Sequence, residues 1–233
     1  MTPAQPCYVI ASSRPWNSGL SARLAARVRA RFPMISAPAD LTPAALADLA
    51  PRYVFFPHWS HIIPEEIHGA FECVIFHMTD LPYGRGGSPL QNLIARGHDN
   101  TKITALKCER GLDTGPVYLK RDLSLEGAAG EIFARADRII EDMIVEIVEQ
   151  QPLPQPQSGE PTLFKRRTPA MSNLKDAKTL DEVYDLIRMM DAEGYPQAFL
   201  EVGPLRFEFS HTVRTTGGLS ADVRITAEEK SKE

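Results

Sequence analysis

The fold is decided by residues 73–116, which read CVIFHMTDLPYGRGGSPLQNLIARGHDNTKITALKCERGLDTGP. The stretch begins with an uninterrupted apolar run that predicts a short buried strand ending at His77. A Pro- and Gly-rich loop follows, and Ser88-Pro89 predicts the start of a helix, with Ser as N-cap and Pro at the first helical position. A second strand, predicted over residues 102–108, leads toward Asp113. Because ligands of open α/β sheets bind beyond the carboxyl ends of strands, we expect His77 and Asp113 to share a site.

Length and composition indicate one sizeable globular domain with an appendage. The chain has 233 residues, of which 43% are hydrophobic and 24% charged, and its formal net charge is −4. Such a chain is long enough to bury a core. It carries no overall basic field that would attract nucleic acid, so we expect no nucleic-acid partner and regard tRNA as a disfavoured substrate.

The cysteines and the N-terminus suggest a cytoplasmic protein. Cys7, Cys73 and Cys108 lie in or beside apolar runs, which favours buried thiols over metal ligands or disulfides. We see neither a leader-like segment nor an apolar run of the roughly 20 residues that a membrane helix needs.

The first strand–loop–helix unit offers a candidate anion site. An apolar strand at residues 7–11 is followed by a polar turn and a helix with apolar residues at helical spacing. Backbone N–H groups at such a turn can hold a phosphate, together with Ser12, Ser13, Arg14 and Asn17. A turn that only caps the helix is an equally good interpretation, because no known phosphate-loop motif is present.

A second loop, Pro57–Pro64, follows a strand predicted over residues 52–56. It contains His58 and His61, which could suggest a metal site. We disfavour metal binding because no third ligand stands at a suitable spacing.

The rest of the chain predicts a long amphipathic helix over residues 126–149, a Pro-rich segment, a helix at 180–190, and two short strands near 199–202 and 206–211. The predicted fold class is α/β, a Rossmann-like open and mostly parallel sheet with a C-terminal helix and β-hairpin. The predicted divisions are a catalytic domain over 1–150, a linker over 151–163, an extension over 164–214 and a disordered tail over 215–233.

The central stretch resembles the signature of N10-formyltetrahydrofolate-dependent formyltransferases. That pattern is His-x-Ser/Thr-x-Leu-Pro-x-x-Arg-Gly-x-x-Pro, followed by Leu-Asp-x-Gly-Pro. The matching positions here are His77, Thr79, Leu81, Pro82, Arg85, Gly86, Pro89, Leu112, Asp113, Gly115 and Pro116. The residues at these positions are most similar to those of the sugar-nucleotide N-formyltransferases and of the formylation domain of gramicidin synthetase. The C-terminal segments around Arg166–Pro169, Ile187-Arg188 and Tyr195–Phe199 also resemble the sugar-nucleotide branch.

The resemblance implies transfer of a formyl group from N10-formyltetrahydrofolate to the amino group of a nucleotide-linked amino sugar, without a metal and in a possible homodimer. The alternatives are a small amino-acid or hydroxyornithine amine as acceptor, or a folate- or nucleotide-binding module that has lost catalysis. The implied catalytic residues are His77 and Asp113. The implied folate contacts are Trp59, His61, Ile62, Ile63, Arg110 and Leu112. The expected substrate contacts are Ser12, Ser13, Arg14, Thr79, Arg85, Gly86 and Gly87.

One position departs from the family pattern. The family usually carries Asn two residues before the His, and Ile75 stands there in this chain. Formyl transfer needs a donor to the developing oxyanion, and losing one such donor typically costs roughly 2.7–4 kcal/mol. We therefore expect a replacement donor. The candidates are a backbone N–H of the Leu81–Ser88 loop, Thr79, Asn92 and His58.

Overall fold

The computed structural model describes residues 5–227, which form two compact units. The first unit comprises the residues up to Gly86, Lys102–Leu123 and Arg135–Leu163, and the second comprises Gly87–Thr101, Ser124–Ala134 and the residues from Phe164 onward. The chain thus enters the second unit three times. The predicted boundary at residue 150 differs from this division because periodicity does not report which segments pack together.

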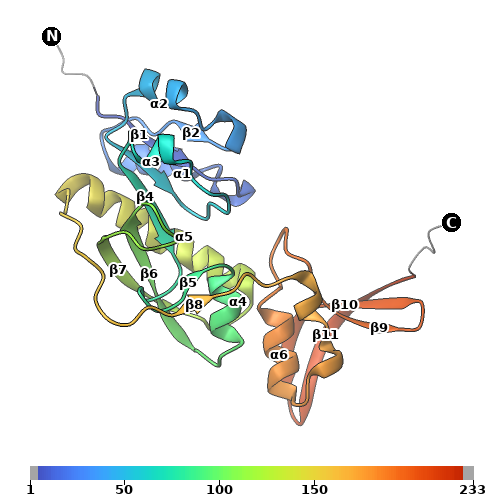
Figure 1. Ribbon diagram of the computed structural model, residues 1–233. Helices are drawn as coiled ribbons and strands as arrows, with labels where there is room; N and C mark the ends of the chain where they lie inside the picture. The colour runs from blue at the N-terminus through green and yellow to red at the C-terminus, as the bar shows by residue number, and fades with distance from the viewer. Residues whose placement is uncertain (1–4, 228–233) are drawn as a thin grey trace. The chain divides into compact units, whose positions relative to one another are not determined.

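A six-stranded sheet forms the centre of the first unit (Figure 1). Its strands in spatial order are β2 (Met34–Ile35), β1 (Tyr8–Ala11), β3 (Tyr53–Phe56), β4 (Cys73–His77), β6 (Asn100–Lys107) and β7 (Val117–Ser124). The first four strands pair in parallel, and β6 pairs antiparallel to β4. The predicted α/β class with a mostly parallel sheet is confirmed.

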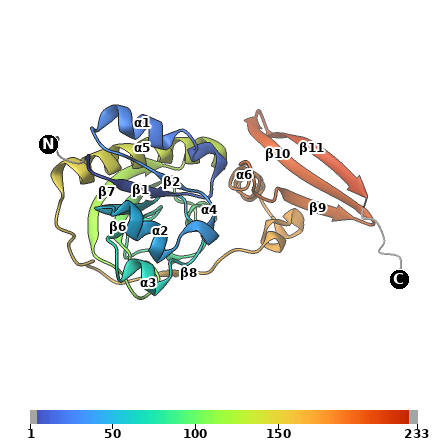
Figure 2. The ribbon, with the colours of Figure 1, turned by 90° about the horizontal axis from the view of Figure 1, so that it is seen from above.

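Helices cover both faces of this sheet (Figure 2). On one face lie α1 (Leu20–Arg27) and α5 (Ala129–Gln150), which are joined by ion pairs from Arg23 and Arg27 to Glu141. On the other face lie α2 (Pro43–Leu49) and α3 (Glu65–His68). These two helices contribute to a core cluster whose buried members include Val9, Leu46, Val54, Phe56 and Ile67.

Strand β4 brings the site histidine to the end of this core. Successive strand residues point to opposite faces, so Cys73, Ile75 and His77 share one face. Cys73 belongs to the core cluster and Ile75 packs against it. His77, the last residue of β4, is buried at 7% exposure. The core therefore fixes the strand that positions this imidazole.

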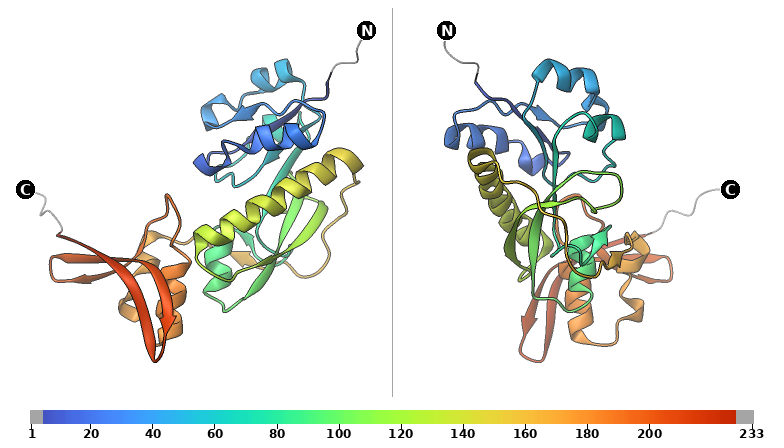
Figure 3. Two further views of the ribbon diagram at one scale, coloured as in Figure 1. Left: turned by 180° about the vertical axis from the view of Figure 1, so that it is seen from behind. Right: turned by 60° about the vertical axis from the view of Figure 1, so that its left-hand side comes forward.

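The second unit combines short helices with a three-stranded antiparallel sheet (Figures 1 and 3). Its main elements are α4 (Pro89–Ile94), α6 (Leu180–Arg188), β9 (Ala198–Val202), β10 (Leu205–Thr215) and β11 (Gly218–Ala227), with α6 packed on β10.

Short 3-10 helices occur in the chain at Pro15–Asn17, Pro38–Asp40, Pro169–Ser172 and Leu174–Asp176. The short strands β5 (Arg85–Gly86) and β8 (Leu163–Phe164) pair with each other.

The prediction of a disordered tail over residues 215–233 is wrong for its first part. Strand β11 occupies Gly218–Ala227 and pairs with β10 along its whole length. Apolar and polar residues do alternate in LSADVRITA, but two of the five apolar positions are Ala, and the segment was interpreted as small, charged and without periodicity. The rest of the predicted tail, residues 228–233, lies outside the described residues.

Arg188, in the Ile187-Arg188 segment noted in the sequence, makes buried contacts within the second unit. Its side chain is only 9% exposed and donates to the backbone oxygens of Leu125 and Gly127, at 2.6 and 3.0 Å. It also forms an ion pair with Asp185 at 2.6 Å. Arg188 thus ties α6 to the residues that precede α5.

Candidate functional site

A backbone carbonyl fixes the protonation pattern of His77. The Nε2 atom of His77 lies 2.8 Å from the oxygen of Gly84. A carbonyl oxygen can only accept, so Nε2 carries the proton and donates it. In the neutral ring the other nitrogen, Nδ1, then carries a lone pair. The Gly84 carbonyl, and not Asp113, therefore sets the tautomer of the His77 ring.

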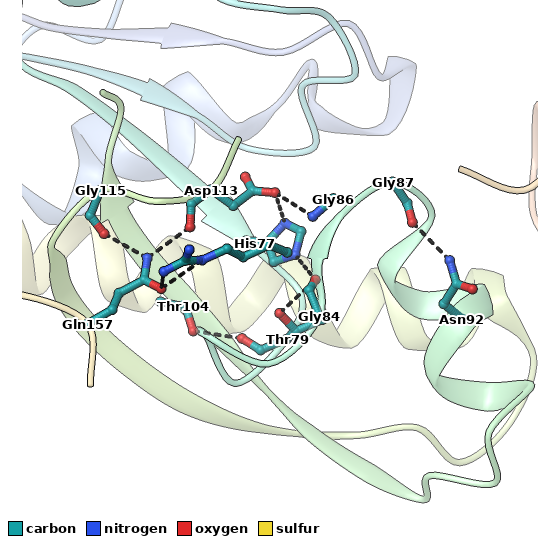
Figure 4. A network of polar contacts seen from close by, with 11 residues as sticks. His77, Thr79, Gly84, Gly86, Gly87, Asn92, Thr104, Asp113, Gly115 and Gln157 are labelled. Carbon is teal, nitrogen blue, oxygen red and sulfur yellow. Dashed lines mark hydrogen bonds and ion pairs between the residues drawn. The ribbon is translucent and has the colours of Figure 1, made fainter. Parts of the chain in front are cut away.

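Asp113 faces the nitrogen that is left with the lone pair (Figure 4). Its Oδ2 lies 3.5 Å from His77 Nδ1, and both side chains are less than 10% exposed. The same oxygen accepts the backbone N–H of Gly86 at 2.9 Å. A lone pair and a carboxylate repel each other, whereas a protonated Nδ1 would be attracted to Asp113. The pair is therefore arranged for Nδ1 to receive a proton.

Asp113 reaches His77 by a route that differs from the predicted one. Because β6 runs antiparallel to β4, its carboxyl end lies beside Cys73, where the N–H of Cys108 donates to the Cys73 oxygen at 2.8 Å. The rule that parallel strands end at one edge therefore does not apply to Asp113. Residues 108–116 fold back instead, with Asp113 at φ 54°.

Gly115 permits this return of the chain. A Cβ at Gly115 would lie 1.9 Å from the backbone oxygen of Lys107. Any side chain at this position would push the Asp113 loop away from β6. The Gly of the loop motif is thus required by a close backbone approach.

The remaining predicted residues of the central stretch have structural partners. Thr79 is fully buried and its hydroxyl donates to Gly84, while its own carbonyl accepts from Thr104. Arg85 donates to Gln157. In the second unit, the N–H of Gly87 donates to Phe164, and a Cβ at Gly87 would lie 2.8 Å from the Arg166 Cα. The Gly-rich loop is thus closely packed as well as polar.

The predicted folate residues divide into buried and exposed groups. Ile63 is 8% exposed and belongs to the core cluster, against which Trp59 also packs. Ile62 is 90% exposed and Leu112 is 63% exposed, and both His61 and Arg110 are exposed. These residues are not members of the polar network drawn in Figure 4.

Side chains of the predicted anion loop, residues 12–17, form hydrogen bonds with one another. Ser12 is buried, and its hydroxyl accepts the side-chain N–H of Asn17 at 2.9 Å. Ser13 and Arg14 are half-buried. The Oδ1 atom of Asn17 is buried without a hydrogen-bond partner, which offers an acceptor at this loop. Asn17 was among the residues expected to hold a phosphate at this turn, but its side-chain N–H already donates to Ser12 and its free oxygen is an acceptor.

Most of the predicted replacements for the family Asn are already occupied. The side-chain N–H groups of Asn92 serve the oxygens of Gly87, Ser88 and Lys165. His58 pairs with Asp137 at 2.7 Å. Ile75 itself packs against the core cluster.

The indole N–H of Trp59 was not among those candidates, yet it is buried without a hydrogen-bond partner. A buried donor of this kind calls for a partner. Trp59 and Ile75 both pack against the core cluster. Trp59 thus offers an unused donor on the side of the sheet where the family Asn would stand.

Cys108, at the start of the Asp113 loop, is held as a neutral thiol. Burial raises the pKa of Cys108 to about 11, and the carboxylates of Asp113 and Glu109 act in the same direction. Burial likewise raises the pKa of Cys73. Neither thiol is a thiolate nucleophile near neutral pH.

Within residues 5–227, we find no group of three or more His, Cys, Asp or Glu side chains that could hold a metal ion. The described helices also include none that is both long and apolar enough to span a membrane.

Comparison with known proteins places these features in a family. Residues 169–226 match the family model described as the methionyl-tRNA formyltransferase C-terminal domain. A curated methionyl-tRNA formyltransferase from Thermodesulfovibrio yellowstonii is 26% identical over 154 residues, which cover 61% of this chain and 49% of that protein. The chain thus spans about half the length of this curated relative.

Solved structures match over a greater length. A sugar N-formyltransferase from Shewanella sp has a TM-score of 0.65 at 15% identity and covers 97% of this chain, which shows a shared fold. A structure named methionyl-tRNA formyltransferase from Clostridium thermocellum has a TM-score of 0.93. Because its 46% identity extends over 95% of this chain and 99% of that one, the protein belongs to the formyltransferase family.

Proposed function

We propose that the protein is an N-formyltransferase that moves a formyl group from N10-formyltetrahydrofolate to an amine. The observation that carries this proposal is the His77 arrangement, in which Gly84 holds one ring nitrogen and leaves Nδ1 beside the Asp113 carboxylate. That arrangement suits a group that must take a proton from a nucleophile.

The residues have defined tasks in this proposal. The acceptor amine must be neutral to attack, and it loses a proton as the new N–C bond forms. His77 Nδ1 takes that proton, and Asp113, 3.5 Å away, stabilises the charged ring. The proton is then returned to the nitrogen that releases the formyl group, so the ring ends as it began. Burial of both side chains strengthens their interaction by excluding water.

The residues present fit a folate. The unpartnered buried N–H of Trp59 offers a donor, and the exposed Ile62 and Leu112 offer apolar surface to an aromatic ring system. Bound N10-formyltetrahydrofolate would supply the formyl group. In this assignment Trp59 takes over the donor task of the family Asn that Ile75 replaces.

For the acceptor we propose a nucleotide-linked amino sugar. The motif wording and the C-terminal segments around Arg188 and Tyr195–Phe199 support this class by resemblance. Charge supports it as well. Residues 164–227 contain nine Lys and Arg and nine Asp and Glu, so this part carries no excess of positive charge for a tRNA backbone.

Methionyl-tRNA is the second candidate acceptor, because the relatives at 26% and 46% identity carry that name. A direct comparison of acceptors tests the proposal. The full chain is incubated with N10-formyltetrahydrofolate and, in parallel, with a panel of nucleotide-linked amino sugars, methionyl-tRNA, or small amino acids including hydroxyornithine. Products are identified by mass spectrometry.

The outcomes of this comparison are distinct. Formylation of an amino sugar supports the full proposal. Formylation of methionyl-tRNA or of an amino acid alone keeps the transferase activity and overturns the acceptor. If no acceptor is formylated, a folate- or nucleotide-binding module that has lost catalysis becomes the better interpretation.

We also propose that a second copy of this chain pairs along β11. This strand lies at the edge of its sheet. If two copies of β11 pair antiparallel with Val223 facing Val223, each Asp222 meets an Arg224. The side chains on the Val223 face are then all apolar, and among them Val223 and Ile225 are 47% and 58% exposed.

Sedimentation velocity tests this pairing. We expect the wild type to sediment as a dimer and Arg224→Asp to sediment as a monomer, since like charges then face each other. The exchange Asp222→Arg with Arg224→Asp restores the match and should restore the dimer. A wild-type monomer, or a dimer unaffected by Arg224→Asp, would contradict the proposal.

A further inference from the structure

Gln157 lies in the segment that the sequence marked only as a Pro-rich linker. Its side-chain Nε2 donates to the backbone oxygens of Asp113 and Gly115, both at 2.8 Å. Its Oε1 accepts from Arg85 Nη2 at 2.8 Å and from Arg85 Nε at 3.2 Å. A side-chain amide has two donor hydrogens and two acceptor lone pairs. All four are used here (Figure 4).

These contacts join the loops that carry the catalytic pair. Asp113 and Gly115 belong to the loop that returns from β6, and Arg85 belongs to the loop after β4. Gly84 and Gly86, on either side of Arg85, hold His77 Nε2 and Asp113 Oδ2 respectively. Gln157 therefore links the backbone of the Asp113 loop, through the Arg85 side chain, to the loop that holds His77 Nε2 and Asp113 Oδ2.

Neighbouring contacts hold the segment of Gln157 in place. The N–H of Thr162 donates to Pro82 at 3.2 Å, and the N–H of Arg85 donates to Thr162 at 2.9 Å. Val117 and Gln155 exchange both backbone hydrogen bonds, at 2.7 and 2.8 Å. The segment is thus attached to β7 before Gln157 and to the loop after β4 beyond it.

We propose that Gln157 is a positioning residue for formyl transfer, which holds the Asp113 loop at the distance from His77 that proton transfer requires. This inference rests on the proposed function. Gln157 does not touch the reacting groups itself. It acts through the backbone of Asp113, which stands at a positive φ of 54° and so lies in a region that few non-glycine residues adopt unaided.

Gln157→Glu gives the sharpest test, because it has nearly the same shape. The acceptors for Arg85 remain, but a carboxylate oxygen replaces Nε2 and faces two carbonyl oxygens. Repulsion should then displace the Asp113 loop. Gln155→Glu is the matched control: it makes the same charge change two residues away, where the side chain is exposed and only Nε2 contacts the Leu153 oxygen.

We expect Gln157→Glu to lower kcat by about tenfold to a hundredfold, since a displacement of about 1 Å at a reacting group can cost about a hundredfold. KM for the folate donor should change less than kcat, because Trp59 and Ile62 lie on another loop and only Leu112 among the proposed folate contacts lies on the displaced one. Gln155→Glu should match the wild type. Gln157→Leu, which loses the hydrogen bonds without repulsion, should give a smaller loss and serves if Gln157→Glu does not fold.

A double-mutant cycle with Asp113→Asn separates positioning from general damage. If Gln157 acts through Asp113, Gln157→Glu should cost much less when Asp113 is already Asn. Equal losses in both backgrounds, or a Gln157→Glu variant as active as Gln155→Glu, would overturn the proposal.

Hydrogen–deuterium exchange supplies a measurement that does not depend on activity. We expect faster exchange in peptides covering residues 108–116 in Gln157→Glu and unchanged exchange there in Gln155→Glu. If the wild type proves inactive with every acceptor, the proposed function fails. The exchange result still decides whether Gln157 holds the loop, and unchanged exchange in Gln157→Glu would refute that role.

Discussion

Replacing Asp113 by Asn isolates the charge that faces His77. The shape of the side chain and its hydrogen bond from the Gly86 N–H, 2.9 Å in the wild type, can both be kept. The attraction between Asp113 and a protonated His77 at 3.5 Å is lost. With an effective dielectric constant of about 20, unit charges at that distance attract by about 5 kcal/mol. This value is an upper limit, since desolvation of the pair offsets part of it.

In the wild type one oxygen of Asp113 both accepts from Gly86 and faces Nδ1. An Asn oxygen that keeps the Gly86 bond therefore also faces Nδ1, but it carries no charge to stabilise a ring that has taken the proton of the amine. We therefore expect kcat to fall by about a hundredfold to a thousandfold, within the range of general acid–base effects. The stability should change by less than about 1 kcal/mol, because the hydrogen bond to Gly86 persists.

Initial rates of formyl transfer, together with thermal unfolding, provide the measurement. Asp122→Asn is the matched control, because Asp122 is 88% exposed and pairs with Lys102 away from the Asp113 loop. If Asp113→Asn retains more than about a tenth of the wild-type kcat, proton transfer at His77 Nδ1 is not assisted by this carboxylate. The mechanism proposed above would then be wrong.

Three further changes test the fold around the site. Gly115→Ala should lower the free energy of unfolding by about 1–3 kcal/mol, because its Cβ would stand 1.9 Å from the Lys107 oxygen. Gly97→Ala meets no atom within 4 Å and adds only the strain of its φ of 75°, so it should cost less in thermal melts. Cys108 should make the free energy of unfolding fall as the pH rises from about 8.5, where the unfolded thiol ionises, toward its folded pKa of about 11. In alkaline denaturant titrations, Cys108→Ala should weaken that loss, and an unchanged dependence of stability on pH would contradict it. Arg188→Met should cost about 2–4 kcal/mol in urea unfolding, because the buried Leu125 oxygen and the partly buried Gly127 oxygen lose a charged donor. A change within experimental error would show that water replaces the guanidinium.

Local patterns predicted much of the first unit, and the tertiary path of the chain supplied the rest. The apolar run before His77 became β4, and the loop motif around Asp113 was recognised as a partner. The expectation that both residues follow strands ending at the same edge of the sheet was wrong, because β6 runs antiparallel to β4. The sequence of either strand alone does not determine the direction in which the two strands pair. Gln157 was missed since its role depends on backbone atoms of distant loops, which leave no side-chain pattern in the sequence.

The search for a donor that replaces the family Asn at position 75 shows a similar limit of prediction from sequence. Sequence comparison identified a missing amide and directed attention to polar residues nearby. The unpartnered N–H belongs to Trp59, which was chosen for its ring and not for its hydrogen. Whether a buried N–H is satisfied depends on three-dimensional surroundings that a motif does not encode.

The group that sets which nitrogen of His77 holds hydrogen is a main-chain oxygen, that of Gly84. An amino-acid replacement at position 84 leaves that oxygen in the chain and can act only through the backbone torsion, since Gly84 stands at φ 75°. An alanine scan of the site would therefore record a harmful substitution there and attribute it to glycine flexibility. Replacing the amide linkage that follows Gly84 by an ester acts on the atom itself, because it weakens the carbonyl as an acceptor; the same change removes the Arg85 N–H that donates to Thr162.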